Sequence, residues 1–342
     1  MPLTDMSLDH CLSYTPALEI PGDLHHFWSA SVAEAEAEAA AQPTRFEPVR
    51  TGMGLVDTYD VTFSGFGGAA VRGWLHIPAK ASDPLPCVVQ FQGYGEGRGR
   101  PWDDVFWAVA GFAHFVMDTR GQGWGRLCGD TPDPVAHGTG EPSPVTWGLD
   151  SPDGYYYRRV YVDAVRACAA CAEHPAVDSG RLVVSGASQG GAVATAAAAL
   201  VPTVRAALVD VPFMSDIARA VDICGVAPYA DVAAVLRHRP ERSAAALRTL
   251  SYFDAAALAG LATAPALLSV AMMDEVCPPS TGFAVYRRYG GPKALHVYRY
   301  GDHGGGESAQ RGEQLQWLSS LLDRARSDVP VDAQTVGGIH IH

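Results

Sequence analysis

A serine stands among small residues in the segment Gly186-Ala187-Ser188-Gln189-Gly190. The apolar run Leu182 to Val184 precedes this segment, and an alanine-rich stretch follows it to Leu200. This order predicts a strand, a tight turn and a helix. Such a turn holds the hydroxyl of Ser188 out over the sheet edge, and the helix N-terminus favours developing negative charge. The alternative is a glycine-rich tight turn that carries an inert serine.

A serine hydroxyl becomes an effective nucleophile when a base takes its proton and an acid orients that base. After a strand–turn–helix of this kind the expected chain order is serine, acid, histidine. Asp274 follows the apolar run that ends at Ala271, and His303 follows the run Leu295 to Tyr300. Both lie just past an expected strand, at the edge where open parallel sheets carry their sites. Position alone leaves two rival acids open, Glu275 and Asp302.

The same chemistry needs hydrogen-bond donors for the oxyanion that forms when the serine attacks. One expected donor is the backbone N–H of Gln189, which follows the serine directly. The second should come from a loop after an earlier strand. The segment Gln92-Gly93-Tyr94-Gly95 follows the apolar run Cys87 to Phe91 and offers the N–H of Tyr94. The alternative for Tyr94 is an aromatic side chain that packs in a glycine turn.

Short apolar runs alternate with helical stretches along most of the chain. The expected strands are Val56–Phe63, Val71–Ile77, Cys87–Phe91, Ala113–Met117, Leu182–Ser185, Ala206–Val211, Ala266–Ala271 and Leu295–Tyr300. The expected helices are Ala33–Gln42 (short and exposed), Asp103–Ala110, Tyr157–Glu173, Gly190–Leu200, Gly282–Arg288 and Glu307–Arg326. Buried strands that alternate with helices predict an α/β fold, with a mostly parallel sheet covered by helices on both faces.

Two segments interrupt this alternation. Gly129–Gly154 is rich in Pro, Gly and Asp and is typical of a long functional loop. Phe213–Phe253 is a mainly helical insertion between two expected strands, and we expect it to form a cap near the active site. We therefore expect a single domain over residues 1–326, followed by a polar tail over residues 327–342.

The composition excludes several classes of function. The chain has 342 residues, of which 48% are hydrophobic, enough for a large core. Its net charge of −12 and its lack of a basic run argue against a nucleic-acid partner. It contains no apolar run of about 18 residues, so no membrane association is expected. Residues 1–27 do not resemble a secretory signal. The seven cysteines are scattered, and Cys168 and Cys171 lie in a helical stretch. We therefore expect reduced thiols and a cytoplasmic location.

Further motifs accompany the serine segment along most of the chain. They are Gly93-Tyr94, Gly97-Arg98-Gly99, Val116–Gly123, Tyr155–Arg159, Asp210–Phe213, Leu250–Asp254, Met273-Asp274 and Cys277–Thr281. In these motifs the chain resembles the family-seven carbohydrate esterases, the group that contains acetyl xylan esterases and cephalosporin-C deacetylases. The Arg-Gly-Gln motif at Arg120 and the Gly-x-Ser-Gln-Gly motif at Ser188 are together specific to this family among α/β-hydrolases.

The resemblance implies an α/β-hydrolase fold and a role for each candidate residue. It implies that Ser188 is the nucleophile, His303 the general base and Asp274, rather than Glu275, the acid that orients it. It also implies an oxyanion hole from the N–H groups of Tyr94 and Gln189. Arg120 and Gln122 would brace the loops around the nucleophile, and packing of Arg120 against carboxylates is the structural alternative.

The resemblance also implies acetyl esters of varied alcohols as substrates, no metal or other cofactor, and a homo-oligomer. Members often form hexameric rings whose sites face an interior cavity. Because an acetyl group is small, we expect a tight pocket near Pro212 and Phe213 to exclude longer acyl chains. Family members usually carry His-Glu at the catalytic histidine, whereas Gly304 follows His303 here, which puts the bracing of the histidine loop in doubt.

Two alternatives to acetyl ester hydrolysis remain open. One is a hydrolase of the same fold that acts on longer esters, lactones or peptides. The other is a non-catalytic binding protein that retains the fold, suggested only by the missing glutamate. The natural alcohol cannot be named from the sequence.

Overall fold

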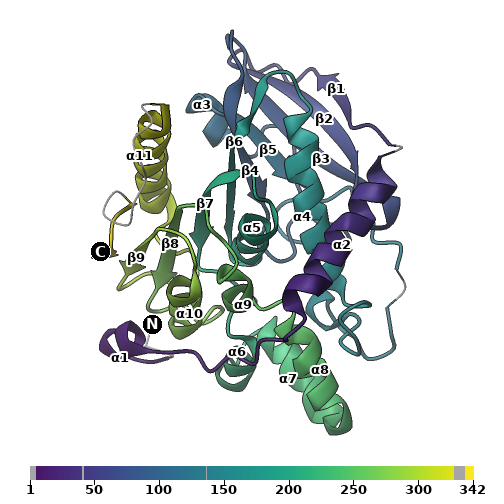
Figure 1. Ribbon diagram of the computed structural model, residues 1–342, viewed down its shortest axis with the longest axis vertical. Coiled ribbons are helices and arrows are strands. Elements are labelled where there is room, and N and C mark those ends of the chain that lie inside the picture. Colours follow the sequence, from purple (N-terminus) through teal and green to yellow (C-terminus); the bar gives the residue numbers. More distant parts are fainter. Residues whose placement is uncertain (1–4, 41, 136, 327–335) are drawn as a thin grey trace. The chain divides into compact units, whose positions relative to one another are not determined.

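The computed structural model describes residues 5–40, 42–135, 137–326 and 336–342. The chain divides into two compact units. One, which we call the serine unit, comprises His25–Val135 and Arg159–Ala207. The other, the histidine unit, comprises Met1–Leu24, Ala136–Arg158 and Leu208–His342. Figure 1 labels most elements of both units.

The serine unit is built on a mixed sheet. Its strands are β1 (Arg45–Val49), β2 (Val56–Ser64), β3 (Ala70–Pro78), β4 (Leu85–Phe91), β5 (Ala113–Met117) and β6 (Val177–Ala187), and they are hydrogen-bonded in the order β1-β2-β3-β5-β4-β6. Strand β2 pairs antiparallel with β1 and β3, and β3 pairs antiparallel with β5. Strand β4 runs parallel to both β5 and β6. The parallel part places the carboxyl ends of β4 and β6 at one edge, where the loops that follow them can meet.

Four helices accompany these strands: α2 (Leu24–Ala39), α3 (Phe106–Val109), α4 (Tyr156–Ala172) and α5 (Gln189–Leu200). Helix α5 packs against β4 and β6. Its residues from Gln189 to Ala198 are all buried, and this explains why they are almost all small. Helix α4 buries both Cys168 and Cys171, and the seven cysteines of the chain are free thiols.

Helix α2 corrects one expectation. The sequence predicted a short exposed helix over residues 33–42, whereas the helix runs from Leu24 to Ala39. One of its faces is buried, with Trp28 and Ala35 in the core, and the Trp28 ring lies 5.6 Å from the ring of Tyr161 in α4. Figure 1 shows the two helices side by side. The early turns carry aromatic and histidine residues rather than the Ala-Glu repeat, so packing rather than helix propensity determines where the helix begins.

The histidine unit contains four strands among its described residues. These are β7 (Val204–Asp210), which enters the unit at Leu208, β8 (Ala266–Ala271), β9 (Lys293–Tyr298) and β10 (Ile339–Ile341), in the order β7-β8-β9-β10. Strand β9 runs parallel to β8 and to β10. The helices are α1 (Leu8–Ser13), α9 (Ala255–Ala259), α10 (Pro279–Arg288) and α11 (Glu307–Arg326). Helix α10 packs on β8, β9, α9 and α1.

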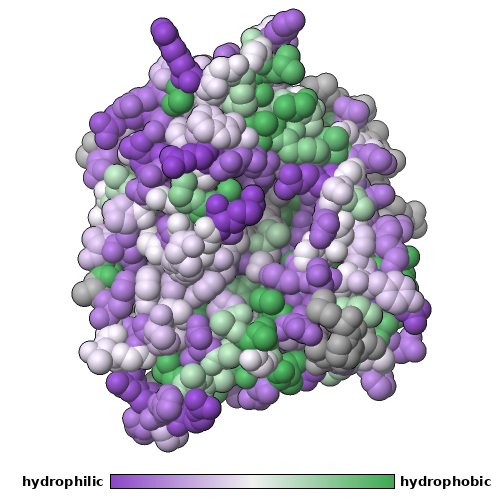
Figure 2. All heavy atoms as spheres, turned by 180° about the vertical axis from the view of Figure 1, so that it is seen from behind, coloured by the Kyte–Doolittle hydropathy of each residue, from purple (hydrophilic) through white to green (hydrophobic). Residues whose placement is uncertain are grey.

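The predicted insertion is helical. It contains α6 (Ile217–Ile223), α7 (Tyr229–His238), the 3-10 turn η3 (Pro240–Arg242) and α8 (Ser243–Ser251). Buried side chains such as Tyr229, Val232 and Leu250 hold the insertion to its own unit. The end of the α7–α8 hairpin is strongly hydrophilic, at the lower left of Figure 2. Whether the insertion acts as a cap remains a prediction.

Other expectations can be compared with the described residues. The loop Gly129–Gly154 contains only the 3-10 turn η2 (Pro144–Thr146) as regular structure among its described residues. The expected helix Asp103–Ala110 is reduced to the single turn α3, and β9 ends two residues earlier than expected. Of the expected polar tail, residues 327–335 lie outside the described residues, and residues 339–341 form β10. Among the described helices, none has the length and apolar character needed to cross a membrane.

Candidate active site

Ser188 occupies a strained turn between β6 and α5. Strand β6 ends at Ala187 and α5 begins at Gln189, which confirms the predicted order of strand, turn and helix. Ser188 has φ 56° and ψ −120°, a conformation that residues with a Cβ rarely adopt. A Cβ on Gly186 would lie 2.3 Å from the carbonyl carbon of Gly190, and a Cβ on Gly190 would lie 2.2 Å from the oxygen of Phe91. Glycine is therefore required on both sides of this turn, and the serine is held at the first N–H groups of α5.

A network of side-chain amides fixes the loop after β4 to the start of α5. Gln189 is fully buried, and its Nε2 donates hydrogen bonds to the carbonyl oxygens of Gln92 and Gly93 over 3.3 and 3.2 Å. The Oε1 of Gln122 accepts from the backbone N–H of Gly95 over 2.6 Å, and its Nε2 donates to the Oε1 of Gln189 over 2.8 Å. The backbone of the loop 92–95 is thus held from both ends by two glutamine side chains.

Tyr94 lies within this loop and is half-buried. Its ring packs edge-on against Trp124, with ring centroids 5.9 Å apart and an angle of 85° between the planes. The ring packing that we gave as the alternative explanation for Tyr94 is therefore present. It does not conflict with a role for the backbone N–H, because the ring and the N–H are separate groups. Packing of the ring in fact helps to fix the position of the N–H.

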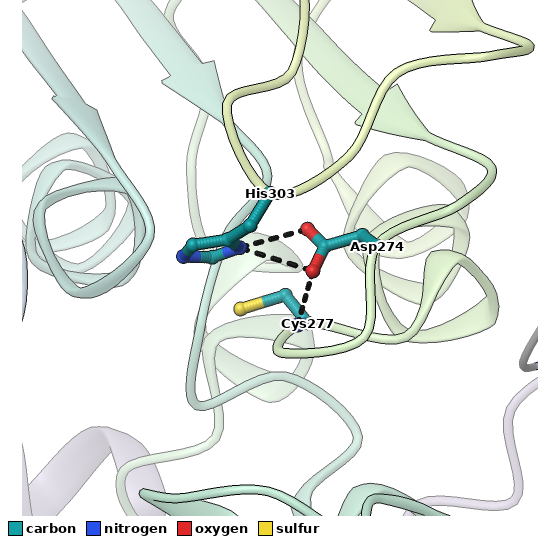
Figure 3. A group of neighbouring side chains, drawn as sticks. All are labelled: Asp274, Cys277 and His303. Carbon is teal, nitrogen blue, oxygen red and sulfur yellow. Dashed lines mark hydrogen bonds and ion pairs between the residues drawn. The ribbon is translucent and has the colours of Figure 1, made fainter. Parts of the chain in front are cut away.

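Asp274 and His303 form a pair in the histidine unit (Figure 3). The Nδ1 of His303 lies 2.9 Å from Oδ2 and 3.0 Å from Oδ1 of Asp274. The Oδ1 also accepts the backbone N–H groups of Val276 and Cys277, each over 2.8 Å. Asp274 has no exposed side-chain surface, whereas the side chain of His303 is 33% exposed. Because a carboxylate can only accept, Nδ1 carries the hydrogen and Nε2 is left as the basic nitrogen.

The geometry separates Asp274 from the two rival acids. The Glu275 side chain is exposed, although it is the next residue along the chain. Asp302 is also exposed, and its Oδ1 accepts the N–H of Gly304 over 3.0 Å. Asp302 thus stabilises the turn that carries His303, whereas Asp274 is the acid in contact with the imidazole.

The turn after His303 has its own supports. The N–H of Gly305 donates to the carbonyl oxygen of Asp302 over 2.9 Å. A Cβ on Gly306 would lie 2.1 Å from a ring carbon of Tyr298, so the turn packs closely on β9 at a position that only glycine can occupy. A Cβ on Gly304 would lie 3.0 Å from Oε1 of Glu307. Asp302 and this close packing therefore brace the histidine loop that lacks the usual glutamate at position 304.

Known proteins are similar to this chain in sequence and in structure. A family model described as acetyl xylan esterase matches residues 1–321. The chain belongs to the acetyl xylan esterase family. An acetyl esterase of Xylanibacter ruminicola is 28% identical over 319 residues, which cover 90% of this chain and 69% of that protein.

Two solved structures from the same family are similar over nearly their whole length. An acetyl xylan esterase from a Paenibacillus species has a TM-score of 0.84 and 32% identity, covering 92% of this chain and 99% of the other. Acetyl xylan esterase 1 from a Thermoanaerobacterium species has a TM-score of 0.84 and 29% identity, covering 93% and 99%. This member of the family is accordingly a carboxylic ester hydrolase with the α/β-hydrolase fold, as the motifs predicted.

Arg120 of this esterase pairs with buried carboxylates. Its Nε and Nη2 donate to the two oxygens of Asp163 in α4 over 2.5 and 2.6 Å, and its Nη1 lies 3.7 Å from Asp133. Asp163 also accepts the N–H of Phe66 over 2.9 Å. Burial raises the pKa of Asp163, and the adjacent guanidinium opposes that rise. These contacts tie α4 to the turn after β2, and they match the structural alternative for Arg120.

Pro212 and Phe213 follow the end of β7 and are buried. The ring of Phe213 packs against Tyr229 of α7, with centroids 4.5 Å apart. The Cδ of Pro212 lies 3.8 Å from the position that a Cβ on Gly282 in α10 would take. Both residues are therefore fixed within the histidine unit, and their expected role in limiting acyl length stays a prediction.

The sequence analysis assigned no role to two residues near the His303 loop, although each begins one of the quoted motifs. Asp210 ends β7 and accepts hydrogen bonds from Ser269 over 2.7 Å, from Gln310 over 2.9 Å and from Gln314 over 2.6 Å. Burial raises the pKa of this carboxyl. It thereby ties α11, which begins just after the histidine turn, to β7 and β8. An acid directly after an apolar strand was the available signal, the same one that identified Asp274.

The other such residue is Cys277, three positions after Asp274. Its side chain is 4% exposed and lies beside the imidazole of His303 (Figure 3). Among the described residues, Asp274, Cys277 and His303 are the one group of acid, cysteine and histidine side chains whose potential metal-ligand atoms all lie within 4.8 Å of one another. In the sequence this cysteine appeared among seven scattered thiols and as the first residue of the motif Cys277–Thr281, without a role of its own.

Proposed function

We propose that this esterase removes acetyl groups from small acetylated molecules by two-step acyl transfer. Ser188 is the proposed nucleophile, His303 the general base and Asp274 the acid that orients the base. The proposed oxyanion donors are the backbone N–H groups of Tyr94 and Gln189. No metal or other cofactor takes part in the proposed reaction.

In the first step the Oγ of Ser188 attacks the acetyl carbonyl carbon while Nε2 of His303 takes the hydroxyl proton. The carbonyl oxygen becomes an oxyanion, which the two N–H groups stabilise. The tetrahedral intermediate then collapses, the C–O bond to the alcohol breaks, and His303 returns the proton to the leaving alcohol. In the second step water gives its proton to His303 and attacks the acetyl-serine. Acetate leaves and Ser188 recovers its proton.

The observation that carries this proposal is the conformation of Ser188. A positive φ at a non-glycine residue is costly, and such strain is concentrated at functional sites. The turn places the Oγ beside the N-terminus of α5, which favours the negative charge that develops on the attacking group and the substrate. The Asp274–His303 pair adds support, because an imidazole with Nδ1 on a carboxylate is the base that this chemistry requires.

The proposed substrates are acetylated xylo-oligosaccharides and cephalosporin C. Support for the first comes from the relatives, which include acetyl xylan esterases. We further propose that the chain acts in the cytoplasm as a homo-oligomer, with a hexameric ring as the form to test. A ring whose sites face an interior cavity would admit oligosaccharides and exclude polymeric xylan.

The experiment that tests the nucleophile is hydrolysis of 4-nitrophenyl acetate by the wild type and by Ser188→Ala. We expect kcat to fall by at least about 10⁴-fold, as is typical when a triad nucleophile is removed. Ser82→Ala, at an exposed position, is the matched control and should keep the wild-type rate. An unchanged rate in Ser188→Ala would show that another residue is the nucleophile. A wild type that hydrolyses no acetyl ester would favour the binding-protein alternative.

A series of 4-nitrophenyl esters separates acetyl esterase activity from the nearest alternative, a hydrolase of longer esters or lactones. We expect kcat/KM to fall by at least about tenfold from acetate to butyrate, because a small pocket discriminates against each added methylene. Phe213→Leu replaces a buried ring beside the proposed pocket with a smaller side chain. It should reduce the fall in kcat/KM from acetate to butyrate. Equal rates across the series in the wild type would contradict the acetyl preference.

A further inference from the structure

Three side chains of different types bring potential metal-ligand atoms close together at His303. They are a carboxylate oxygen of Asp274, the Sγ of Cys277 and a ring nitrogen of His303, all within 4.8 Å of one another. Figure 3 shows the Cys277 sulfur pointing toward the imidazole from the strand-to-helix loop that also carries Asp274. The proposed acyl transfer uses the carboxylate and the imidazole but leaves the thiol without a role.

We propose that these three side chains form a binding site for a thiophilic divalent cation, of which Zn²⁺ is the type. Zinc is commonly bound by one or more Cys, His and Asp side chains in a tetrahedral arrangement. At zinc–ligand distances of about 2.0–2.3 Å, two ligands of one ion lie about 3.4–3.6 Å apart. The His303–Asp274 contact of 2.9 Å therefore has to lengthen by a fraction of an ångström. A water molecule completes the fourth position.

The thiol decides which cation the site selects. A carboxylate and an imidazole accept many divalent ions, but a thiolate favours soft or borderline ions over Mg²⁺ and Ca²⁺. Binding forms the Zn–S, Zn–N and Zn–O bonds, and the protons on Cys277 Sγ and His303 Nδ1 leave to solvent. The ion replaces the proton on Nδ1 of His303 that faces Asp274. No atom of the protein or the metal changes its oxidation state.

The route to the site runs past the imidazole. The side chain of Asp274 is fully buried and Cys277 is 4% exposed, whereas the side chain of His303 is 33% exposed. An ion can therefore reach the cluster by displacement of the histidine ring. This is a site that fills when free metal is present, in contrast to a preformed cage for a permanent cofactor.

Occupation of this site would stop the acyl transfer proposed above, and this consequence rests on the proposed function. An imidazole bound to zinc through Nδ1 no longer donates a hydrogen to its orienting carboxylate, and its Nε2 becomes a weaker base. Zinc therefore acts as a reversible inhibitor that a chelator removes. The binding itself depends only on the three side chains.

The test compares the wild-type chain with Cys277→Ser. Cobalt replaces zinc as a spectroscopic probe, because a Co²⁺–thiolate bond produces a charge-transfer absorption band. We expect the band in the wild type and not in Cys277→Ser. We also expect Cys277→Ser to raise the inhibition constant of ZnCl₂ in 4-nitrophenyl acetate hydrolysis by at least about tenfold, since loss of even an outer partner of a metal site costs this much. Mg²⁺ should not inhibit either protein.

Two controls exclude other binding places. Cys128→Ser removes a thiol of intermediate exposure from the serine unit and should keep both the band and the inhibition. The double variant His340→Ala with His342→Ala removes two imidazoles at the C-terminus, whose rings lie 5.3 and 4.8 Å from the ring of His296 in β9. It should also keep both the band and the inhibition. The rate of each protein without added metal is measured first, and zinc inhibition is expressed as a fraction of that protein's own rate, so a change in basal activity in Cys277→Ser does not enter the comparison.

Each outcome bears on the proposal. A cobalt band of equal strength in Cys277→Ser, no Zn²⁺ binding by the wild type in calorimetry, or equal zinc inhibition of both proteins would overturn it. If the wild type shows the band but hydrolyses no ester, the cation site stands and the proposed function fails. The binding experiments thus separate the two proposals.

Discussion

The side-chain amide of Gln122 donates a hydrogen bond to that of Gln189 over 2.8 Å, across 67 positions of the sequence. This contact joins the loop after β5 to the first residue of α5. Gln122 also accepts the N–H of Gly95, and Gln189 donates to the carbonyl of Gly93. The two residues that flank Tyr94 are therefore held by the same pair of glutamines, and the position of its N–H depends on them.

We predict that Gln122→Ala lowers kcat of acetyl ester hydrolysis by about tenfold or more and changes KM little. Direct loss of an oxyanion donor costs about 10²–10³ in kcat, and loosening of the donor loop should cost part of this. Steady-state kinetics with 4-nitrophenyl acetate measures the two constants separately. Gln316→Ala, an exposed glutamine on α11, is the matched control. An unchanged kcat in Gln122→Ala would mean that the loop keeps its place without the bridge.

Asp274→Asn tests the partner of the histidine. We expect kcat to fall by about 10⁴-fold, because an amide in place of the carboxylate stabilises the wrong imidazole tautomer. Glu275→Gln is the control, since this neighbouring carboxyl is exposed and should leave the rate unchanged. Hydrolysis of 4-nitrophenyl acetate by the two variants measures both effects. A larger loss of kcat in Glu275→Gln than in Asp274→Asn would show that Glu275 is the acid that orients His303.

The sequence predicted the positions of Ser188, Asp274 and His303 because each is marked by a local pattern. A buried strand produces a continuous apolar run, and the polar residue after it is easily recognised. The same pattern could not choose between Asp274 and Glu275. Adjacent residues in a turn point in different directions, and only the folded backbone shows which carboxyl is buried against the imidazole.

Edge strands and short helices were beyond this kind of prediction. Strand β1 contains a proline, and each of its residues is exposed or half-buried, so it lacks an apolar run. Strand β10 has three residues, all exposed. Both are defined by hydrogen bonds to a neighbouring strand, which a local pattern does not encode. The contacts of Asp210 and Cys277 could not be predicted for a related reason, because their partners lie far away in the sequence.

A buried histidine in the serine unit predicts sensitivity to acid. His76 is 1% exposed, and its Nδ1 lies 3.0 Å from the hydroxyl of Thr58. Burial, together with the nearby His114, lowers the pKa of His76 to about 3. The unfolded chain takes up the proton near pH 6.5, so the neutral histidine stabilises the fold fully above that pH. This stability is lost at about 1.4 kcal/mol per unit as the pH falls from about 6.5 toward 3.

We therefore predict that the wild type loses about 2 kcal/mol more of its free energy of unfolding than His76→Gln between pH 7 and pH 5. Urea titrations of both proteins at the two pH values measure this difference. Buried carboxyls such as Asp254, whose pKa burial raises to about 6, act in the opposite direction. They are present in both proteins and cancel in the comparison. His26→Gln, at an exposed position of α2, should follow the wild type, and an equal pH dependence in His76→Gln would refute the assignment.

The Arg120–Asp163 pair predicts a large effect on stability. The side chains of both residues are 1% exposed, so removal of the guanidinium leaves a carboxylate buried without its main counter-charge. We expect Arg120→Met to lower the free energy of unfolding by about 3–5 kcal/mol. The double variant with Asp163→Leu should recover part of this loss, because no unpaired charge is then buried. Arg158→Met, in the first turn of α4, breaks a partly exposed pair with Asp153, which precedes the helix, and should cost less than about 1 kcal/mol. If the double variant were less stable than Arg120→Met alone, the hydrogen bond from Phe66 to Asp163 would matter more than the buried charge.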